Sequence, residues 1–357
     1  MLKTHRCSSA MDGSLQRNNT KDMVSDMDRR DFFKATGAAT LGVSFGSFAA
    51  NAESAEQSNT RGAFSTYGNQ VSIYTGAQVK PTRIFHITDT HMSMDDKRGE
   101  PYREFSKRMA LAYRSNSHYL TGEKYSARES FTQTLALAKE EKADFLALTG
   151  DLFSFPSLAA VEWTLEKLEQ TNIPYAYVAG NHDWHYEGMK GSAQQLRDTW
   201  ISKHLSPMYQ GNNPLYAAYN LNKIRFVCID NSTYEVLPEQ LEFFRAQVAT
   251  KKPLVLLMHI PLYMPGRSMG FGCGNPHWGE KSDYNYKIER REKWRKGGHT
   301  QVTMDFHDEV FKASNLLSVM VGHVHAQSLD IKNGIPQIVS SYNATGYYAD
   351  VRIETMS

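Results

Sequence analysis

Val178-Ala179-Gly180-Asn181-His182-Asp183 is the stretch around which the rest of this 357-residue chain is organised. An apolar run from Tyr175 to Val178 ends abruptly there in polar residues. This pattern predicts a strand that delivers side chains to a loop at its C-terminal end, where open α/β sheets place their sites. Asn181 offers a neutral oxygen ligand, and His182 offers a group that exchanges a proton near neutral pH. Asp183 is expected to hold and orient that imidazole.

Four other predicted strands also lead into metal-ligand residues. Apolar runs at residues 83–88, 144–149, 253–258 and 316–321 are followed by Asp89 and His91, Asp151, His259, and His323 and His325. Strand ends of one sheet converge in space even when they are far apart in sequence. This mixed set of nitrogen and oxygen donors, without cysteine, suits Zn, Mn or Fe better than Mg or Ca. Seven ligands are too many for one metal with an open position, and they suit two metals that share a carboxylate.

The ordered series of motifs closely resembles the calcineurin-like binuclear metallophosphoesterases. Its five blocks are Asp89-x-His91, Gly150-Asp151, Gly180-Asn181-His182-Asp183, His259 and Gly322-His323-x-His325, and they span residues 89–325. Each block alone is a weak signal, whereas the ordered set is a strong one. The resemblance implies an α/β fold, namely a four-layer α-β-β-α sandwich of two mixed sheets flanked by helices.

The resemblance also implies a role for each residue. The first metal would be held by Asp89, His91 and His325, the second by Asn181, His259 and His323, and Asp151 would bridge both. His182 and Asp183 would be the catalytic residues, with His182 near the leaving group and Asp183 beside it. The implied reaction is hydrolysis of a small-molecule phosphate ester by a hydroxide that bridges two divalent or trivalent ions of Fe, Mn or Zn.

At two points this sequence differs from particular branches of that family. Purple acid phosphatases have a metal-bound Tyr shortly after the Gly-Asp block, where this chain has Leu152, Phe153, Ser154 and Phe155. The Asp-Arg-Gly extension of the protein Ser/Thr phosphatases is also absent. What remains resembles the bacterial cyclic-nucleotide and phosphodiester branch, so a phosphodiester is the favoured substrate. A phosphomonoesterase on the same core and a catalytically silent metal-bound binding protein remain as alternatives, although the latter would be expected to have lost a ligand or the acid.

Residues 1–52 have the features of an export signal. Asp28-Arg29-Arg30-Asp31-Phe32-Phe33-Lys34 precedes a mildly apolar run that ends in Ala50-Asn51-Ala52. The paired arginines resemble a twin-arginine signal, and the run is too short and too rich in Gly and Ala to span a bilayer. We therefore expect the twin-arginine export machinery as a partner, a periplasmic or otherwise exported location, and no stable membrane anchor after cleavage. Translation could also start at Met23 or Met27.

The charge balance gives no indication of a nucleic-acid partner. Residues 1–52 hold 7 of the 40 Lys and Arg and 5 of the 38 Asp and Glu, which leaves 33 of each in the remainder. A neutral chain argues weakly against a nuclease. Three cysteines do not make a disulfide framework. Cys228 lies in an apolar run and is expected in the core, and two free thiols are favoured over a Cys228–Cys273 disulfide.

The expected organisation has a linker over residues 53–80 that runs into an edge strand near Gln70 to Tyr74, and a metallophosphoesterase domain over residues 81–357. An insertion at 92–125 has tyrosines that are expected to pack against it rather than to form a stacking platform. A second insertion at 261–300 is rich in Gly, aromatic and basic residues, and Arg267 and His277 within it are predicted, with Asn181, to contact substrate. His86 is predicted to be a packed or hydrogen-bonded histidine. Helices are expected at 126–141, 157–170, 238–250 and 305–313, and an irregular segment at 184–215.

Overall fold

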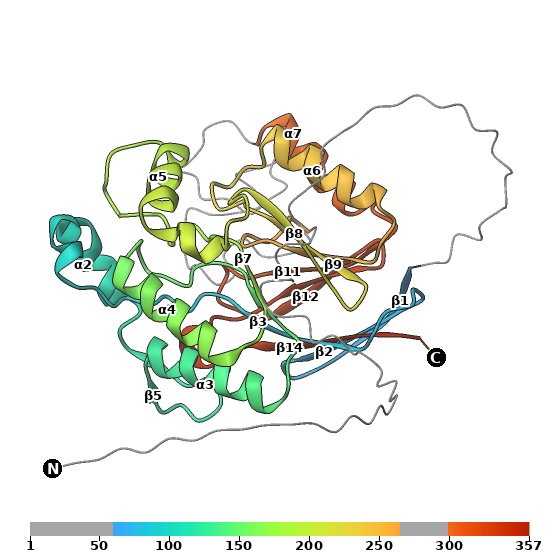
Figure 1. Ribbon diagram of the computed structural model, residues 1–357, viewed down its shortest axis with the longest axis horizontal. Coiled ribbons are helices and arrows are strands. Elements are labelled where there is room, and N and C mark those ends of the chain that lie inside the picture. The colour runs from blue at the N-terminus through green and yellow to red at the C-terminus, as the bar shows by residue number, and fades with distance from the viewer. Residues whose placement is uncertain (1–59, 265–298, 357) are drawn as a thin grey trace, which may run out of the picture.

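The computed structural model describes residues 60–264 and 299–356 (Figure 1). The first of its two large sheets has the strand order β1-β2-β14-β3-β6-β7. β3, β6 and β7 are mutually parallel, and β14 runs antiparallel to β3. The strands are β1 (Arg61–Tyr67), β2 (Gln70–Thr75), β3 (Thr82–Ile87), β6 (Phe145–Leu148), β7 (Tyr175–Tyr177) and β14 (Ala349–Thr355).

The second sheet has the order β12-β13-β11-β10-β9-β8. Its four inner strands are parallel, and an antiparallel strand closes each edge. The strands are β8 (Tyr216–Leu221), β9 (Ile224–Ile229), β10 (Leu254–Leu257), β11 (Leu316–Val321), β12 (Ser328–Lys332) and β13 (Ile335–Val339).

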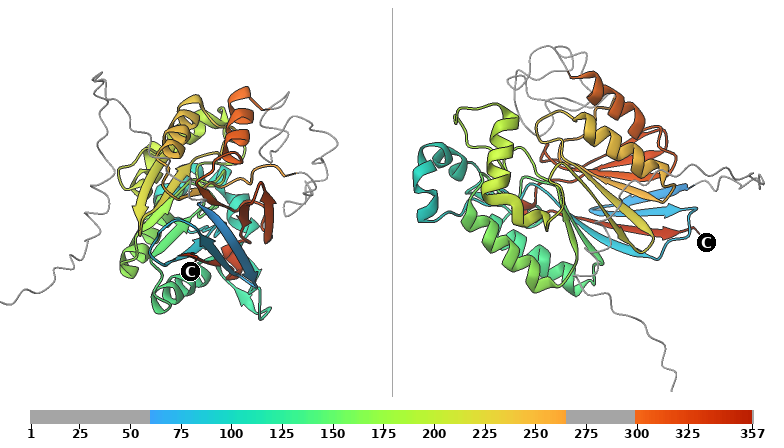
Figure 2. Two further views of the ribbon diagram at one scale, coloured as in Figure 1. Left: turned by 90° about the vertical axis from the view of Figure 1, so that its right-hand side faces the viewer. Right: turned by 45° about the horizontal axis from the view of Figure 1, so that its top comes forward.

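Helices cover the outer face of each sheet (Figures 1 and 2). α3 (Ala127–Glu140) and α4 (Leu158–Thr171) share a buried cluster with the first sheet. α6 (Pro238–Ala249) and α7 (Gln301–Val310) share another with the second sheet. A third cluster lies between the sheets, where Phe145 stacks on Phe226 with ring centroids 4.4 Å apart. The inner strands β6 and β10 are apolar along their whole length because both of their faces are buried. The expected four-layer α-β-β-α sandwich is confirmed.

Shorter elements connect the strands. The segment between β3 and α3 contains η1 (Lys97–Tyr102), α2 (Arg103–Ala112), β4 (Asn116–Ser117) and β5 (Lys124–Tyr125). α5 (Ala193–Trp200), η2 (Ile201–Leu205) and η3 (Ser206–Tyr209) follow β7, and η6 (Asn343–Thr345) precedes β14. Within the described ranges, no helix combines the length and the apolar character needed to cross a membrane.

Three expectations about individual elements were wrong. The segment 184–215 contains α5, which Ser192 begins with a capping box. α7 starts at Gln301 rather than at 305, because the Thr300 side chain accepts a hydrogen bond from the backbone N–H of Thr303. β2 does not lie at the edge of its sheet, since β1 pairs with its outer side.

Candidate metal centre

Five strands, three from the first sheet and two from the second, bring the predicted ligands together. β3 leads into Asp89 and His91, β6 into Asp151, and β7 into Asn181 and His182. β10 and β11, in the other sheet, lead into His259 and into His323 and His325. Ligand atoms within 4.8 Å of one another form three overlapping clusters: Asp89, His91 and His325; His91, Asp151 and His182; and Asp151, His259 and His323. Asp151 belongs to two of these clusters, so its carboxylate lies between the two ends of the site.

The backbone is in the left-handed region at five of these residues. The φ angles are +54° at Asp89, +52° at His91, +49° at Asp151, +71° at His323 and +55° at His325. A non-glycine residue in this region costs about 1 kcal/mol or more. Such strain persists only where the surrounding structure imposes it, and it concentrates at functional sites.

Glycines precede the ligands where two loops meet closely. A Cβ on Gly180 would lie 2.2 Å from Asp151 Oδ1 and 2.3 Å from the Asp151 backbone nitrogen. A Cβ on Gly322 would lie 2.3 Å from Asp89 Oδ2. Both distances are far below van der Waals contact, so each position accepts only a residue without a side chain.

The Asp89 carboxylate is fixed by one oxygen, and its other oxygen points into the site. Oδ2 accepts hydrogen bonds from the Thr88 hydroxyl at 2.7 Å and from the His323 backbone N–H at 2.8 Å. Oδ1 is buried without a hydrogen-bond partner among the described residues, and it lies 3.2 Å from His325 Nε2 and 3.8 Å from His91 Nε2. The two Nε2 atoms are 2.9 Å apart. Three donor atoms that converge in this way fit a metal ion.

The cluster of Asp151, His259 and His323 also has donor atoms that converge on one point. His259 Nδ1 bonds the Thr149 carbonyl oxygen at 2.7 Å, which directs Nε2 toward Asp151 Oδ2 at 3.2 Å. A ligand histidine held through its other nitrogen is typical of metal sites. The Oδ1 atom of Asn181 is buried nearby without a hydrogen-bond partner among the described residues. The buried, unsatisfied oxygen of Asn181 therefore also fits a metal ligand.

Burial and mutual charge set the protonation of these groups. Burial, together with the neighbouring His182 and His325, holds the pKa of His91 well below its usual value, so that this imidazole is neutral. Burial would raise the pKa of Asp151, but the charges of His259 and His182 outweigh it and hold that pKa well below its usual range. Burial would lower the pKa of His259, but the charge of Asp151 outweighs this effect and raises that pKa to about 9. A metal at this pair would replace a proton.

His182 lies beside the shared carboxylate. Its backbone N–H donates to Asp151 Oδ1 at 2.7 Å, and its ring meets that of His91 edge-on with centroids 4.9 Å apart.

Asp183 is buried and joins two loops. Its Oδ1 accepts from the Phe153 N–H and its Oδ2 from the Gly180 N–H, both at 2.8 Å. Burial and the charge of Asp151 raise the pKa of Asp183 to about 7. Because both oxygens accept from backbone groups, Asp183 has the geometry of a clamp between the loop after β6 and the loop after β7.

Tyr113 lies in this site, although the tyrosines of residues 92–125 were expected to serve only as packing. Its ring stacks on His91 with centroids 3.7 Å apart and planes 9° apart. The expectation that these tyrosines serve only as packing was therefore wrong for Tyr113. It holds for Tyr102, which packs against Tyr186 and Trp200. Arg267 and His277, predicted to contact substrate, lie outside the described residues.

His86 and Cys228 match their expectations. His86 is buried and bonds Thr149 and Ser340 at 2.7 Å each. Cys228 is a buried free thiol between the sheets.

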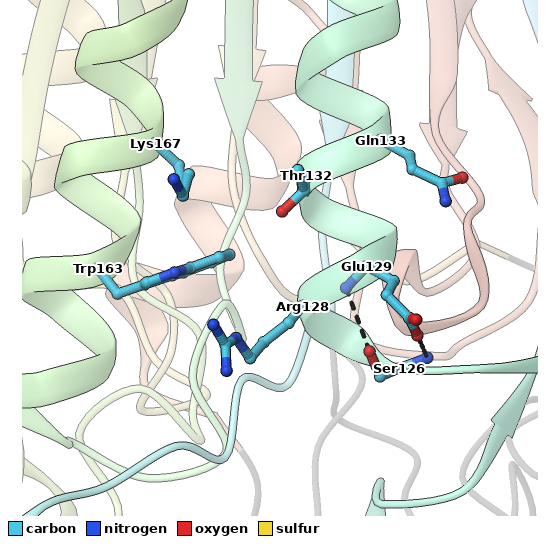
Figure 3. Close-up of a pocket in the computed structure, with 7 residues that line it drawn as sticks. All are labelled: Ser126, Arg128, Glu129, Thr132, Gln133, Trp163 and Lys167. Carbon is cyan, nitrogen blue, oxygen red and sulfur yellow. Dashed lines mark hydrogen bonds between the residues drawn. The ribbon is translucent and has the colours of Figure 1, made fainter.

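A hollow of about 570 Å³ lies elsewhere, on the outer face between α3 and α4 (Figure 3). Its lining comes from these two helices and from Ser126, the N-cap of α3, whose capping box with Glu129 is drawn there. Arg128 and Lys167 lie 5.4 and 5.9 Å from the Trp163 ring centroid. The contact of Arg128 with Trp163 joins α3 to α4.

Comparisons with known proteins identify a family and several relatives. A family model for calcineurin-like phosphoesterases matches residues 82–327, more than half of the chain. A probable cyclic nucleotide phosphodiesterase of Moraxella catarrhalis (strain BBH18) is 37% identical over 71 residues, which cover 19% of this chain and 26% of that protein. A second protein of that name, from Psychrobacter sp. (strain PRwf-1), is 23% identical over 290 residues, or 74% of this chain and 76% of that protein. The crystal structure of a dimetal phosphatase from Danio rerio has a TM-score of 0.47 at 11% identity, over 75% of this chain and 91% of that one.

The match to the Moraxella protein thus spans about a quarter of that relative's length. The family model, in contrast, runs from β3 past His325 and includes all of the candidate ligands. The family implies divalent metal ions, for which the three clusters supply candidate ligands. The chain belongs to the calcineurin-like phosphoesterase family, a family of hydrolases that act on phosphate esters.

Proposed function

We propose that this chain is an exported metal-dependent phosphodiesterase. The observation that carries the proposal is the set of three overlapping ligand clusters at the ends of strands from both sheets, two of which share Asp151. Asp89, His91 and His325 would hold one metal ion, and Asn181, His259 and His323 the other. Such ions supply Lewis-acid stabilisation of the phosphoryl oxygens and lower the pKa of bound water.

The protein's own groups would then orient the substrate and move a proton. The backbone N–H of His182 is tied to Asp151 Oδ1, so its imidazole is held next to the shared carboxylate. There it would donate a proton to the leaving oxygen, a contribution on the order of 10²–10⁴-fold in rate. Asp183 would act indirectly, by joining the loop after β6 to the loop after β7. Its hydrogen bonds with the backbone N–H groups of Phe153 and Gly180 hold these two loops in a fixed relative position.

Support for a diester comes from the two relatives, which are named probable cyclic nucleotide phosphodiesterases. The absence of a Tyr or Asp-Arg-Gly block after Asp151 points the same way. The test compares bis-p-nitrophenyl phosphate with p-nitrophenyl phosphate on metal-free protein that is titrated with Mn, Zn, Fe and Co. Metal-restored turnover that is faster on the diester supports the proposal, whereas faster monoester turnover makes the protein a phosphomonoesterase.

Export is proposed from the sequence of residues 1–52, which lie outside the described part of the chain. Arg29 and Arg30 followed by Phe32-Phe33-Lys34 support the twin-arginine route. Replacing both arginines with lysine should keep the protein in the cytoplasm of a bacterial host in which the unaltered chain is processed and exported. Equal export of the two chains would contradict this route.

A further inference from the structure

A cavity of about 260 Å³ opens beside the candidate metal ligands. Met109 in α2 and Tyr113, the C-cap residue of that helix, line one side of it. Asn181, His182 and His185 from the loop after β7 line the other. Figure 1 shows α2 at the left end of the molecule, beyond the strands of both sheets. The cavity therefore joins the candidate site to a segment that is neither strand nor part of the flanking helix layers.

The Tyr113 ring is held in a fixed orientation next to the candidate proton donor. One of its faces stacks on His91. Its ring also meets His325 edge-on at 5.6 Å and His182 at 6.2 Å between centroids. An aromatic ring that is already ordered loses little conformational freedom when it contacts a ligand. Tyr113 thus presents a rigid apolar surface to the cavity, close to the group that would protonate a leaving oxygen.

The charged residues of the cavity compensate each other. Arg108 Nε donates to Glu187 Oε2 at 2.6 Å, and both residues line the cavity. Arginine binds phosphate and carboxylate groups through charge-assisted, often bidentate hydrogen bonds, for which its N–H groups must be available to the ligand. Here the guanidinium is already paired with the Glu187 carboxylate, so the cavity offers an aromatic ring, a thioether and imidazoles rather than an unpaired arginine.

We propose that this cavity is the subsite for the leaving group, and that Tyr113 makes it specific for flat, aromatic or heteroaromatic groups without charge. The inference rests on the proposed function, because a leaving group is defined only relative to phosphorus held at the metal site. The volume is slightly below the lower end of the range of about 300–1,000 Å³ for drug-sized ligands. A single ring system therefore fits better than an extended chain.

The test is calorimetric titration of manganese-loaded protein with phenylphosphonate and with methylphosphonate, which share the metal-binding head group and differ only in the organic group. We expect phenylphosphonate to bind about tenfold more tightly. Tyr113→Phe should keep that preference. Tyr113→Ala should abolish it while leaving methylphosphonate affinity and metal content unchanged.

Three results would overturn the inference. The first is equal binding of the two anions by the unaltered protein, and the second is an unchanged preference in Tyr113→Ala. The third is an equal loss of phenylphosphonate and methylphosphonate affinity in Tyr113→Ala. That result would mean that the ring only positions His91 and does not contact the organic group. If neither anion binds the metal-loaded protein, the proposed function itself fails, and the inference fails with it.

The charge preference of the cavity can be tested with 4-phosphonobenzoate, which adds a carboxylate to the same ring. It should bind the unaltered protein no more tightly than phenylphosphonate does. Glu187→Gln, which releases Arg108, should raise its affinity about threefold relative to phenylphosphonate. A tenfold preference for 4-phosphonobenzoate in the unaltered protein would show that the cavity takes acidic groups and would overturn this part of the inference.

Discussion

The close approach of Gly180 to Asp151 makes Gly180→Ala a sharp test of how the site is built. A Cβ at this position would lie 2.2 Å from Asp151 Oδ1 and 2.3 Å from the Asp151 backbone nitrogen, and real Cβ contacts are at least 3.0 Å. The atoms must therefore separate by 3.0 − 2.2 = 0.8 Å and 3.0 − 2.3 = 0.7 Å. Because one of them is a backbone atom, rotation of the Asp151 side chain cannot relieve the overlap.

The expected consequence is a large loss of activity with little loss of fold. Metal-ligand distances tolerate changes of about 0.2 Å, so a shift of this size takes the Asp151 carboxylate out of range. A misplacement near 1 Å costs about 10²-fold in rate, which corresponds to about 2.7 kcal/mol of transition-state stabilisation. The assay is kcat/KM on bis-p-nitrophenyl phosphate, with metal content and thermal unfolding measured on the same preparations.

Gly211→Ala is the matched control. A Cβ there meets nothing within 4 Å, and its φ of +82° makes alanine unfavourable for the backbone alone. We expect it to lower stability by about 1 kcal/mol and to leave kcat/KM unchanged. Gly180→Ala protein that binds two metals and keeps kcat/KM within about threefold of the unaltered chain would refute the reasoning.

Three further predictions concern stability and metal retention. Burial lowers the pKa of His86 to about 3, so from pH 6 to 4 the unfolded state binds a proton at this residue that the folded state does not. Through His86 alone, the free energy of unfolding should fall by about 1.4 kcal/mol per pH unit over this range, and urea titrations of His86→Gln should show a pH dependence that lacks this one-proton contribution. Phe145→Ala should cost about 3–5 kcal/mol in urea unfolding, because the ring is fully buried between the sheets; a loss below about 1 kcal/mol would contradict that packing. Asn181→Ala should lose about one metal per chain by elemental analysis, and Asn181→Asp should keep it; equal metal content in both would remove Asn181 from the ligand set.

Much of the fold was predictable because the strands that carry the ligands are buried on both faces. Such strands are rich in apolar residues, and the polar residues that follow within a few positions mark the strand end. Asp89, Asp151, Asn181, His259 and His323 were found in this way. Parallel strands place their carboxyl ends at one edge, so residues far apart in sequence could be expected to meet.

Other elements gave weaker signals. β1 and β12 are edge strands, whose partly exposed residues lack a long apolar run. α5 has only eight residues, although Ser192 with Gln195 forms a capping box that the sequence displays.

Tyr113 illustrates what periodicity and motifs cannot supply. Its contact with His91 joins residues 22 positions apart and depends on the path of η1 and α2 between them. The left-handed backbone at Asp89 and His323 is likewise set by the loops packed around them, since the hydrogen bond from the His323 N–H to Asp89 links two sheets. No local pattern encodes such contacts.

The most direct test of the central claim is elemental analysis of the unaltered chain and of Asp151→Ala, with turnover of bis-p-nitrophenyl phosphate measured before and after chelation. We predict about two transition-metal ions per unaltered chain, loss of turnover when they are removed and recovery when they are restored. Asp151→Ala should hold fewer than two ions and lose turnover, because its carboxylate is shared between two clusters. Full metal content and full turnover in Asp151→Ala, or undiminished turnover by the metal-free chain, would contradict the account.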